Sequence, residues 1–298
     1  MEQLAIILMD GLVYASWLFL ISAGLTLIYG VLRILNLAHG SLYALGAYAA
    51  ASAVLFYFDR GLWPPGSYVA LLGAALIIGI VAGPLIERGL LRWIYGRDPV
   101  YQLLATYALF LILEDGMKLV WGVNPYYAYR PYGLLGTVQL GGIPYPGYSI
   151  LLIGVALLAG GGLSLFIRFT RIGRLVVAII HDPEISVALG ANVSRLFLLT
   201  FTLGTILAAL GGAFTAPMIS VVPGLSVEVI VLAFAVVVIG GLGSLEGSVI
   251  GALLVGVVRS LMVHRIPELE LFAIYLVMAL VLLFRPQGLF AIEEVRRV

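Results

Sequence analysis

Long, charge-poor runs of apolar residues dominate this chain and limit what it can fold into. They lie at residues 8–31, 40–58, 68–86, 101–121, 149–167, 196–217, 227–241, 248–263 and 269–284. Most approach the roughly 20 residues that a helix needs to cross a membrane, although 227–241 and 248–263 are shorter. The pattern predicts a chain that crosses a membrane many times.

The composition favours helices as the spanning elements. Hydrophobic residues make up 62% of the chain and charged residues only 10%, whereas a soluble domain has roughly 25% charged residues. In lipid, a helix satisfies its own backbone hydrogen bonds, but an open sheet edge or a loop does not. We therefore predict an all-α, polytopic helical membrane protein with eight to ten transmembrane segments in one domain, residues 1–298.

Arginines predict the orientation. With the N-terminus outside, most arginines lie on the inner side, as in other membrane proteins. We therefore expect the N-terminus outside and the C-terminus inside. Residues 1–10 lack the basic start of a cleaved signal peptide, so we expect them to be retained in the first span. The inner set is Arg33, Arg88, Arg92, Arg97, Arg168, Arg171, Arg174, Arg195, Arg285, Arg296 and Arg297, and the outer set is Arg60, Arg130 and Arg265.

One sizeable loop, residues 122–149, lies on the predicted outer side. It is rich in glycine, proline and tyrosine, which favour turns over a packed core. Tyrosines also suit the membrane–water interface. The loop is expected to form an aromatic girdle or, alternatively, a docking surface for an external partner.

Two glycine-rich segments interrupt the apolar pattern. Residues 36–46 and 240–251 each contain a Gly-Ser pair at the start of an apolar run. Paired segments of this kind in the two halves of a transporter point to a translocation path built from broken helices. Small residues also allow tight helix packing, as in Gly204-x-x-x-Ala208-x-x-x-Gly212, and this alternative stays open for each segment. Together, the two segments favour broken helices that line a path.

Few ionisable residues lie within the apolar runs. Glu114 and Lys118 have the i,i+4 order that favours an ion pair, near the outer end of their run. They are expected to anchor the helix or to act at the outer mouth. Glu228 follows Pro223-Gly224 and is expected to stabilise a helix N-terminus. No chain of carboxylates suited to proton coupling is evident, so the energy for transport should come from another protein.

Several chemistries lack the residues they require. The chain contains no cysteine, and His39, His181 and His264 have no second ligand at zinc spacing. The single lysine, Lys118, is not part of a Gly-Lys-Ser/Thr phosphate-binding loop. The basic residues are dispersed and form no patch for nucleic acid. We therefore predict no catalytic residues, no metal, no cofactor and no nucleic-acid partner.

A long polar segment, residues 168–195, separates two apolar runs in the C-terminal half. Asp182 suits a helix N-cap, Pro183 the first helical position and Gly190 the left-handed position that ends a helix. Its arginines favour the cytoplasmic side, where a soluble partner or the lipid surface can be contacted. We predict a short, bounded helix on which a partner exerts force.

These segments resemble a known family. The stretch EISVALG, residues 184–190, matches the Glu-Ala-Ala-x-x-x-Gly loop of ATP-binding-cassette (ABC) importer permeases at its Glu and Gly, but not at Ile185 and Ser186. The stretches NLAHGSLYALGAY, FAVVVIGGLGSLEGSVIGALL and FRPQGLF are similar to those of branched-chain amino acid permeases of the LivH type. The resemblance covers essentially the whole chain. It implies a single transmembrane permease domain with a cytoplasmic coupling loop at 168–195.

The resemblance also implies partners and a location. It implies a second permease subunit, either LivM-like or a homologous copy, together with two cytoplasmic ABC ATPases and an external solute-binding protein. The assembly would sit among the lipids of a prokaryotic inner membrane, and this chain would be a transport subunit, not an enzyme. The implied ATPase-coupling residues are Asp182, Pro183, Glu184, Ile185, Ala188, Leu189 and Gly190.

Polar residues of the two glycine-rich segments are the candidates for the translocation path, because helix N-termini at breaks can face a solute carboxylate. They are Asn36, His39, Ser41, Ser244 and Glu246. The resemblance implies branched-chain amino acids as solutes, and similar permeases carry urea or short amides. A passive urea or water channel also fits the glycine-rich segments, but it has no need of a bounded cytoplasmic helix.

Overall fold

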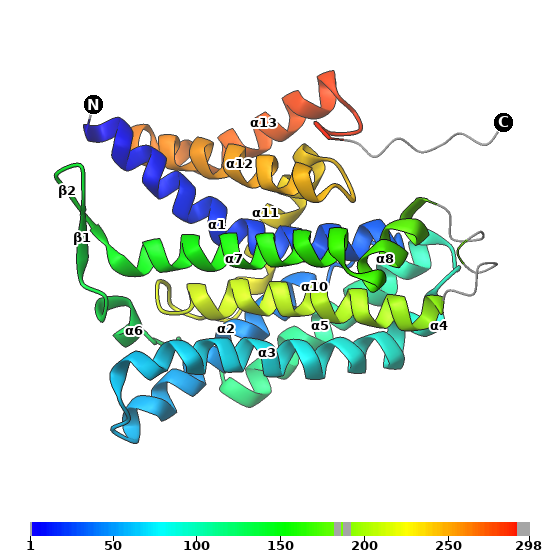
Figure 1. Cartoon of the computed structure of the whole chain (residues 1–298), viewed down its shortest axis with the longest axis horizontal. Helices are drawn as coiled ribbons and strands as arrows, with labels where there is room; N and C mark the ends of the chain where they lie inside the picture. Colours follow the sequence, from blue (N-terminus) through cyan, green and yellow to red (C-terminus); the bar gives the residue numbers. More distant parts are fainter. Residues whose placement is uncertain (1, 182–185, 187–191, 291–298) are drawn as a thin grey trace.

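The computed structural model describes residues 2–181, 186 and 192–290, and its long helices lie roughly side by side (Figure 1). These helices are α1 (Glu2–Leu32), α2 (His39–Asp59), α3 (Ser67–Ile86), α5 (Pro99–Trp121), α7 (Gly147–Phe169), α10 (Val193–Thr215), α11 (Leu225–Gly240), α12 (Leu245–Arg265) and α13 (Glu270–Phe284). The shorter elements are η1 (Pro64–Gly66), the π-helical η2 (Glu87–Leu91), α4 (Arg92–Ile94), α6 (Arg130–Gly133), β1 (Thr137–Leu140), β2 (Ile143–Pro146), α8 (Arg171–His181) and η3 (Pro267–Leu269).

Within the described residues, seven helical stretches are long and apolar enough to cross a membrane. Two further helices coincide with predicted apolar runs. Helix α5 has 23 residues but carries Glu114, Asp115 and Lys118, and helix α11 is apolar but has only 16 residues. Each apolar run of the sequence coincides largely with one of these helices. The predicted polytopic all-α fold is confirmed.

The two ends of the bundle are formed by different elements (Figure 1). The N-terminus and the β1–β2 hairpin lie at one end, and α4 and α8 lie at the other. Arginines of the predicted inner set belong to elements of the second end: Arg88, Arg92, Arg168, Arg171 and Arg174. The predicted inner end is thus rich in arginine, and the side of the membrane that it faces stays a prediction.

Glycines bring the backbones of neighbouring helices together. A Cβ atom at Gly256 of α12 would overlap the carbonyl oxygen of Gly11 in α1. At Gly212 of α10, it would overlap the carbonyl oxygen of Tyr43 in α2. Small residues hold membrane helices together in this way, since the apolar lipid provides little hydrophobic drive for helix association. The Gly204-to-Gly212 motif therefore serves tight packing.

The predicted outer loop folds back on the bundle. Its strands β1 and β2 are antiparallel, with Thr137 opposite Pro146. The connecting Gly141 and Gly142 have φ of 61° and 91°, which suit the two-residue turns of hairpins. The hydroxyl group of Tyr148, which follows the hairpin, donates to the carbonyl oxygen of Phe214 at 2.7 Å. Part of this aromatic loop is thus packed inward, and its use as a docking surface stays a prediction.

The segment after α13 returns to the inner end of α11. The backbone N–H groups of Leu289 and Phe290 donate to the carbonyl oxygens of Ile239 and Gly240, both at 2.9 Å. Gly288 has φ of 85° and lies so close to Gly241 that a side chain would not fit. This contact gives the FRPQGLF stretch a structural role, because it supplies donors to the last carbonyl groups of α11.

Candidate functional site

Helix α2 begins inside the bundle. After α1 ends at Leu32, residues 33–38 are not helical, and the His39 Nε2 atom then lies 3.0 Å from the carbonyl oxygen of Ile21. Ile21 precedes Leu32 by 11 residues, or about 16 Å along a helix. The chain therefore runs back along α1 before α2 starts. The first glycine-rich segment accordingly contains a helix that starts in the interior of the bundle.

Helix α11 also begins inside the bundle, where a carboxylate from α5 caps it. Glu114 precedes Trp121, the last residue of α5, by seven residues, or about 10 Å, and only 8% of it is exposed. Its carboxylate accepts hydrogen bonds from the Gly224 N–H, at 2.6 Å, and from the Ser226 hydroxyl. A negative charge is favoured at this position by the helix dipole and the unpaired N–H groups.

The predicted Glu114–Lys118 ion pair is wrong. The Lys118 Nζ atom lies 3.0 Å from Asp115 Oδ1, and both side chains are largely exposed. Glu114 lies on the buried side of α5, where two donors of α11 satisfy it. The sequence spacing identifies Lys118 as a possible partner of Glu114 within α5. It does not reveal the two donors that Glu114 meets on α11.

The first turns of α2 and α11 lie against each other. A Cβ atom at Gly40 would overlap the carbonyl oxygen of Ser226 and lie 2.7 Å from Cβ of Ile230. The first Gly-Ser pair of the sequence therefore contains a glycine that this helix contact requires. Two interrupted helices meet here in the interior of the bundle.

Three of the predicted path residues lie together at this start of α2. Asn36, His39 and Ser41 are each 0% exposed. In the described part of the chain, His39 Nδ1, Ser41 Oγ and both polar side-chain atoms of Asn36 have no hydrogen-bond partner. Buried polar atoms without partners are rare in native proteins and call for an explanation. The structure groups these residues, and their role in translocation stays a prediction.

The other two path candidates belong to the connection between α11 and α12. Ser244 is the N-cap of α12, where its Oγ accepts a hydrogen bond from the Gly247 N–H at 3.0 Å. A Cβ atom at either Gly240 or Gly247 would overlap the carbonyl oxygen of the other glycine. The glycines of this segment therefore permit a close crossing of two helix ends.

Glu246 lies on the surface next to this crossing. Its carboxylate is 3.1 Å from Arg168 Nη2 of α7, and both side chains are more than half exposed. It also borders an apolar groove of about 330 Å³ between α1, α7 and α12. An exposed ion pair of this kind contributes at most about 1 kcal/mol to stability. A path role for Ser244 and Glu246 stays a prediction.

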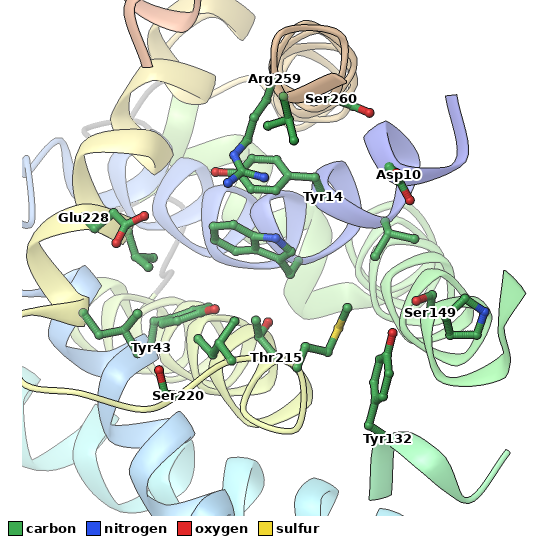
Figure 2. Close-up of a pocket in the computed structure, with 18 of the residues that line it drawn as sticks. Asp10, Tyr14, Tyr43, Tyr132, Ser149, Thr215, Ser220, Glu228, Arg259 and Ser260 are labelled. Carbon is green, nitrogen blue, oxygen red and sulfur yellow. The ribbon is translucent and has the colours of Figure 1, made fainter. Parts of the chain in front are cut away.

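A larger cavity of about 580 Å³ lies next to the hairpin, whose residues Tyr145 and Pro146 line it (Figure 2). We call it the outer cavity, after the predicted orientation of the chain. Its volume lies within the range of roughly 300–1,000 Å³ typical of small-molecule sites. Several helices contribute side chains that carry charges or aromatic rings, among them Asp10, Tyr14 and Trp17 from α1, Tyr43 from α2, Glu228 from α11 and Arg259 from α12. The cavity is thus amphipathic, with aromatic walls and charges of both signs.

Asp10 has partners on two sides. It accepts a hydrogen bond from the Tyr145 hydroxyl at 2.5 Å and lies 3.4 Å from His264 Nε2. Burial, together with the hydrogen bond to Asp10, raises the pKa of Tyr145 above its usual value. The phenol therefore stays protonated and donates to the carboxylate. This contact connects the hairpin to α1 and α12 at the cavity rim.

Arg259 is held by an anion and by an aromatic ring. Its Nη2 atom lies 2.6 Å from Glu270 Oε1, and its Cζ atom lies 4.0 Å from the centre of the Tyr14 ring. Cation–π contacts at this distance stabilise a partly desolvated guanidinium group. The Nε atom has no hydrogen-bond partner within the described ranges.

The sequence does not predict this cavity. Arg259 and Glu228 each have an ordinary explanation in the sequence, as a residue at a span end and as a residue of a first helical turn. Their common position depends on the packing of α1, α11 and α12, and no sequence motif predicts this packing. The available signal is weak: two opposite charges near the outer ends of separate apolar runs.

The predicted ATPase-coupling residues lie outside the described residues. They are Asp182, Pro183, Glu184, Ile185, Ala188, Leu189 and Gly190. Within this stretch the structure describes Ser186, which is helical and 5% exposed. The proposed contact with an ATPase therefore stays a prediction.

Helix α8, just before that stretch, was not predicted. Its residues Val176 and Ile179 are buried, and the helix packs against α7, α1 and α10. Arg33, which follows α1, donates a hydrogen bond through Nη2 to the carbonyl oxygen of Ile180 at 3.4 Å. The polar segment thus begins with an amphipathic helix attached to the bundle.

A multi-pass helical bundle in which two helices begin in the interior resembles the broken-helix arrangement of membrane transport proteins. Residues 7–282 match the family described as the permease component of branched-chain amino acid transport systems. The chain belongs to this family.

Named relatives extend the match over nearly the full length. The chain is 30% identical to the high-affinity branched-chain amino acid transport system permease protein BraD of Pseudomonas aeruginosa, over 98% of this chain and 97% of BraD. It is 27% identical to LivH of Escherichia coli K12, over 97% of this chain and 96% of LivH. It is also 27% identical to LivM of that organism, over 91% of this chain and 67% of LivM. These relatives are transport permease proteins, not enzymes.

Proposed function

We propose that this chain is the membrane-spanning permease subunit of an ABC importer for branched-chain amino acids. The observation that carries the proposal is its nearly full-length similarity to permeases named for high-affinity branched-chain amino acid transport. The walls of the outer cavity support it, because Trp17, Leu225 and Val229 suit an aliphatic side chain.

The same proposal includes the partners and the location. Similarity to both LivH and LivM supports pairing with a second permease subunit. Two cytoplasmic ATPases would bind at the arginine-rich end, and an external binding protein would deliver solute at the hairpin end. The assembly would lie in the prokaryotic inner membrane with the N-terminus outside and the C-terminus inside.

Coupling in this proposal uses residues 168–195. ATP-driven closure of the ATPases would move residues 182–190, and α8 would pass that movement to α7 and α1. The buried contacts of Val176 and Ile179 support this route, since a packed helix transmits displacement. The interrupted starts of α2 and α11 would then rearrange around the path.

Transport by the whole assembly tests the function. Membrane vesicles that hold both permeases, the ATPases and the binding protein should take up labelled leucine only with ATP. Labelled urea should not accumulate. Uptake of urea in place of leucine would contradict the proposed solute, and full-rate leucine movement through the purified chain alone would contradict the importer class.

Replacement of Gly190 by Val tests coupling. We expect this variant to lose leucine uptake and to retain less ATPase on co-purification, because a β-branched residue disfavours the left-handed conformation predicted at the helix end. Gly162→Val in α7 is the matched control, since a Cβ atom there meets nothing within 4 Å. Normal transport by the Gly190 variant would rule out the coupling role.

A further inference from the structure

The outer cavity contains one carboxylate that is not paired. Among the cavity charges, Asp10 is bound by Tyr145 and lies near His264, while Arg259 is bound by Glu270. For Glu228, the described residues supply no ion pair and no hydrogen bond that would neutralise it. Its electrostatic neighbours include the hydroxyl groups of Tyr14 and Tyr43. Glu228 is exposed at the cavity wall, so a cationic group of a solute can reach its carboxylate.

The paired arginine of the same cavity retains donors for an anion. Glu270 is bound through Nη2 of Arg259 and does not line the cavity, whereas Arg259 does. The guanidinium is a planar fork with five N–H donors, so one carboxylate does not exhaust it. Figure 2 shows Glu228, Arg259 and Tyr43 around one side of the cavity.

The remaining wall suits an apolar group. Trp17, Met218, Leu225 and Val229 line the cavity together with the two charged residues. A free carboxylate, an arginine fork and an apolar wall match the three parts of an aliphatic amino acid, namely its ammonium, carboxylate and side chain. A neutral amide such as urea offers neither an ammonium group to Glu228 nor a carboxylate to the remaining N–H donors of Arg259.

We propose that the permease itself binds the amino acid in this cavity as a zwitterion. Glu228 binds the α-ammonium group, Arg259 binds the α-carboxylate, and the side chain lies against Trp17. This inference rests on the proposed function. It adds that, after the binding protein has released the solute, the permease selects solutes that carry both an ammonium group and a carboxylate.

A photoreactive leucine analogue with a diazirine in its side chain tests this binding directly. The probe is applied to the complex of permeases and ATPases without binding protein. We expect cross-links to cavity residues of α1 and α11, and excess leucine should remove them. Neither 4-methylpentanoate, which lacks the ammonium group, nor 3-methylbutylamine, which lacks the carboxylate, should do so. Equal competition by either compound would overturn the proposal.

Variants assign the two roles. Glu228→Gln and the double variant Arg259→Gln/Glu270→Gln should each lower cross-linking and leucine uptake at least about tenfold. The double variant removes both members of the ion pair, so no unpaired charge is left to prevent assembly. Glu268→Gln is the control, because Glu268 lies on the same side, is exposed and does not line the cavity.

The outcomes separate the two proposals. Co-purification of ATPases at the wild-type amount shows that a variant has assembled. If the wild-type assembly imports leucine but both cavity variants transport and cross-link like wild type, the zwitterion site is wrong and the importer function stands. If the wild-type assembly fails to import leucine with ATP, the proposed function fails first.

Discussion

At the scale of single residues, Glu114 connects two helices that are far apart in sequence. It is 110 positions from Gly224, whose N–H it accepts. An ionised group inside a membrane costs a few kcal/mol, so it persists where donors compensate it. The first turn of α11 supplies two such donors, Gly224 and Ser226. The place where α11 begins therefore depends on one side chain of α5.

Replacement of Glu114 by Gln keeps the size of the side chain but removes its charge. We expect a loss of about 1–3 kcal/mol in stability, because the amide accepts weaker bonds and turns one NH₂ group toward existing donors. Thermal unfolding of the purified assembly in detergent measures this change. Asp115→Asn is the control, since this largely exposed pair with Lys118 contributes at most about 1 kcal/mol. Equal losses in the two variants would contradict the capping role.

At the scale of elements, the sequence predicts the long helices well because each is a continuous apolar run. Helix α8 is missed, since Arg171 and Arg174 make an amphipathic surface helix look like a polar connection. The β1–β2 hairpin is missed as well, because β1 is exposed throughout and shows no alternation of buried and exposed residues. Turn residues alone do not specify strand pairing. Both misses are short elements whose stability depends on the neighbouring bundle.

The contact between α2 and α10 can be tested through one glycine. A methyl group at Gly212 would overlap the Tyr43 carbonyl oxygen, so Gly212→Ala must separate the two helices. We expect a loss of about 1–3 kcal/mol in stability, the range for overpacked cores. Gly162→Ala in α7 should be neutral or stabilising by up to about 1 kcal/mol, because a Cβ atom there meets nothing within 4 Å. A thermal melt of both variants gives the comparison, and a stable Gly212 variant would refute the contact.

At the scale of the whole molecule, the predicted polar residues separate into distinct places. Asn36, His39 and Ser41 gather where α2 starts, whereas Ser244 caps another helix and Glu246 lies on the surface. Because both glycine-rich segments contain a Gly-Ser pair, they predict a common site. The sequence does not show which helix ends lie next to each other. The sequence does not predict the outer cavity for the same reason, since its walls come from elements that are far apart in the sequence. A single sequence does not show which helices pack against each other when they are far apart along the chain.

Introduced cysteines test the orientation of the bundle, because the natural chain has none. Gln139→Cys lies on an exposed strand of the hairpin, and Gln287→Cys is exposed beyond α13. In spheroplasts, a membrane-impermeant maleimide should label the first variant directly and the second only after permeabilisation. Labelling in the reverse order would place the arginine-rich end outside and would exclude ATPase binding there.

The segment after α13 completes a helix to which it does not belong. Leu289 and Phe290 donate to the two last carbonyl groups of α11, as a further turn of that helix would do. Rotation of α11 about its axis would break both bonds at once unless the final helix travelled with it. Any movement of α11 during a transport cycle would therefore have to move α13 with it.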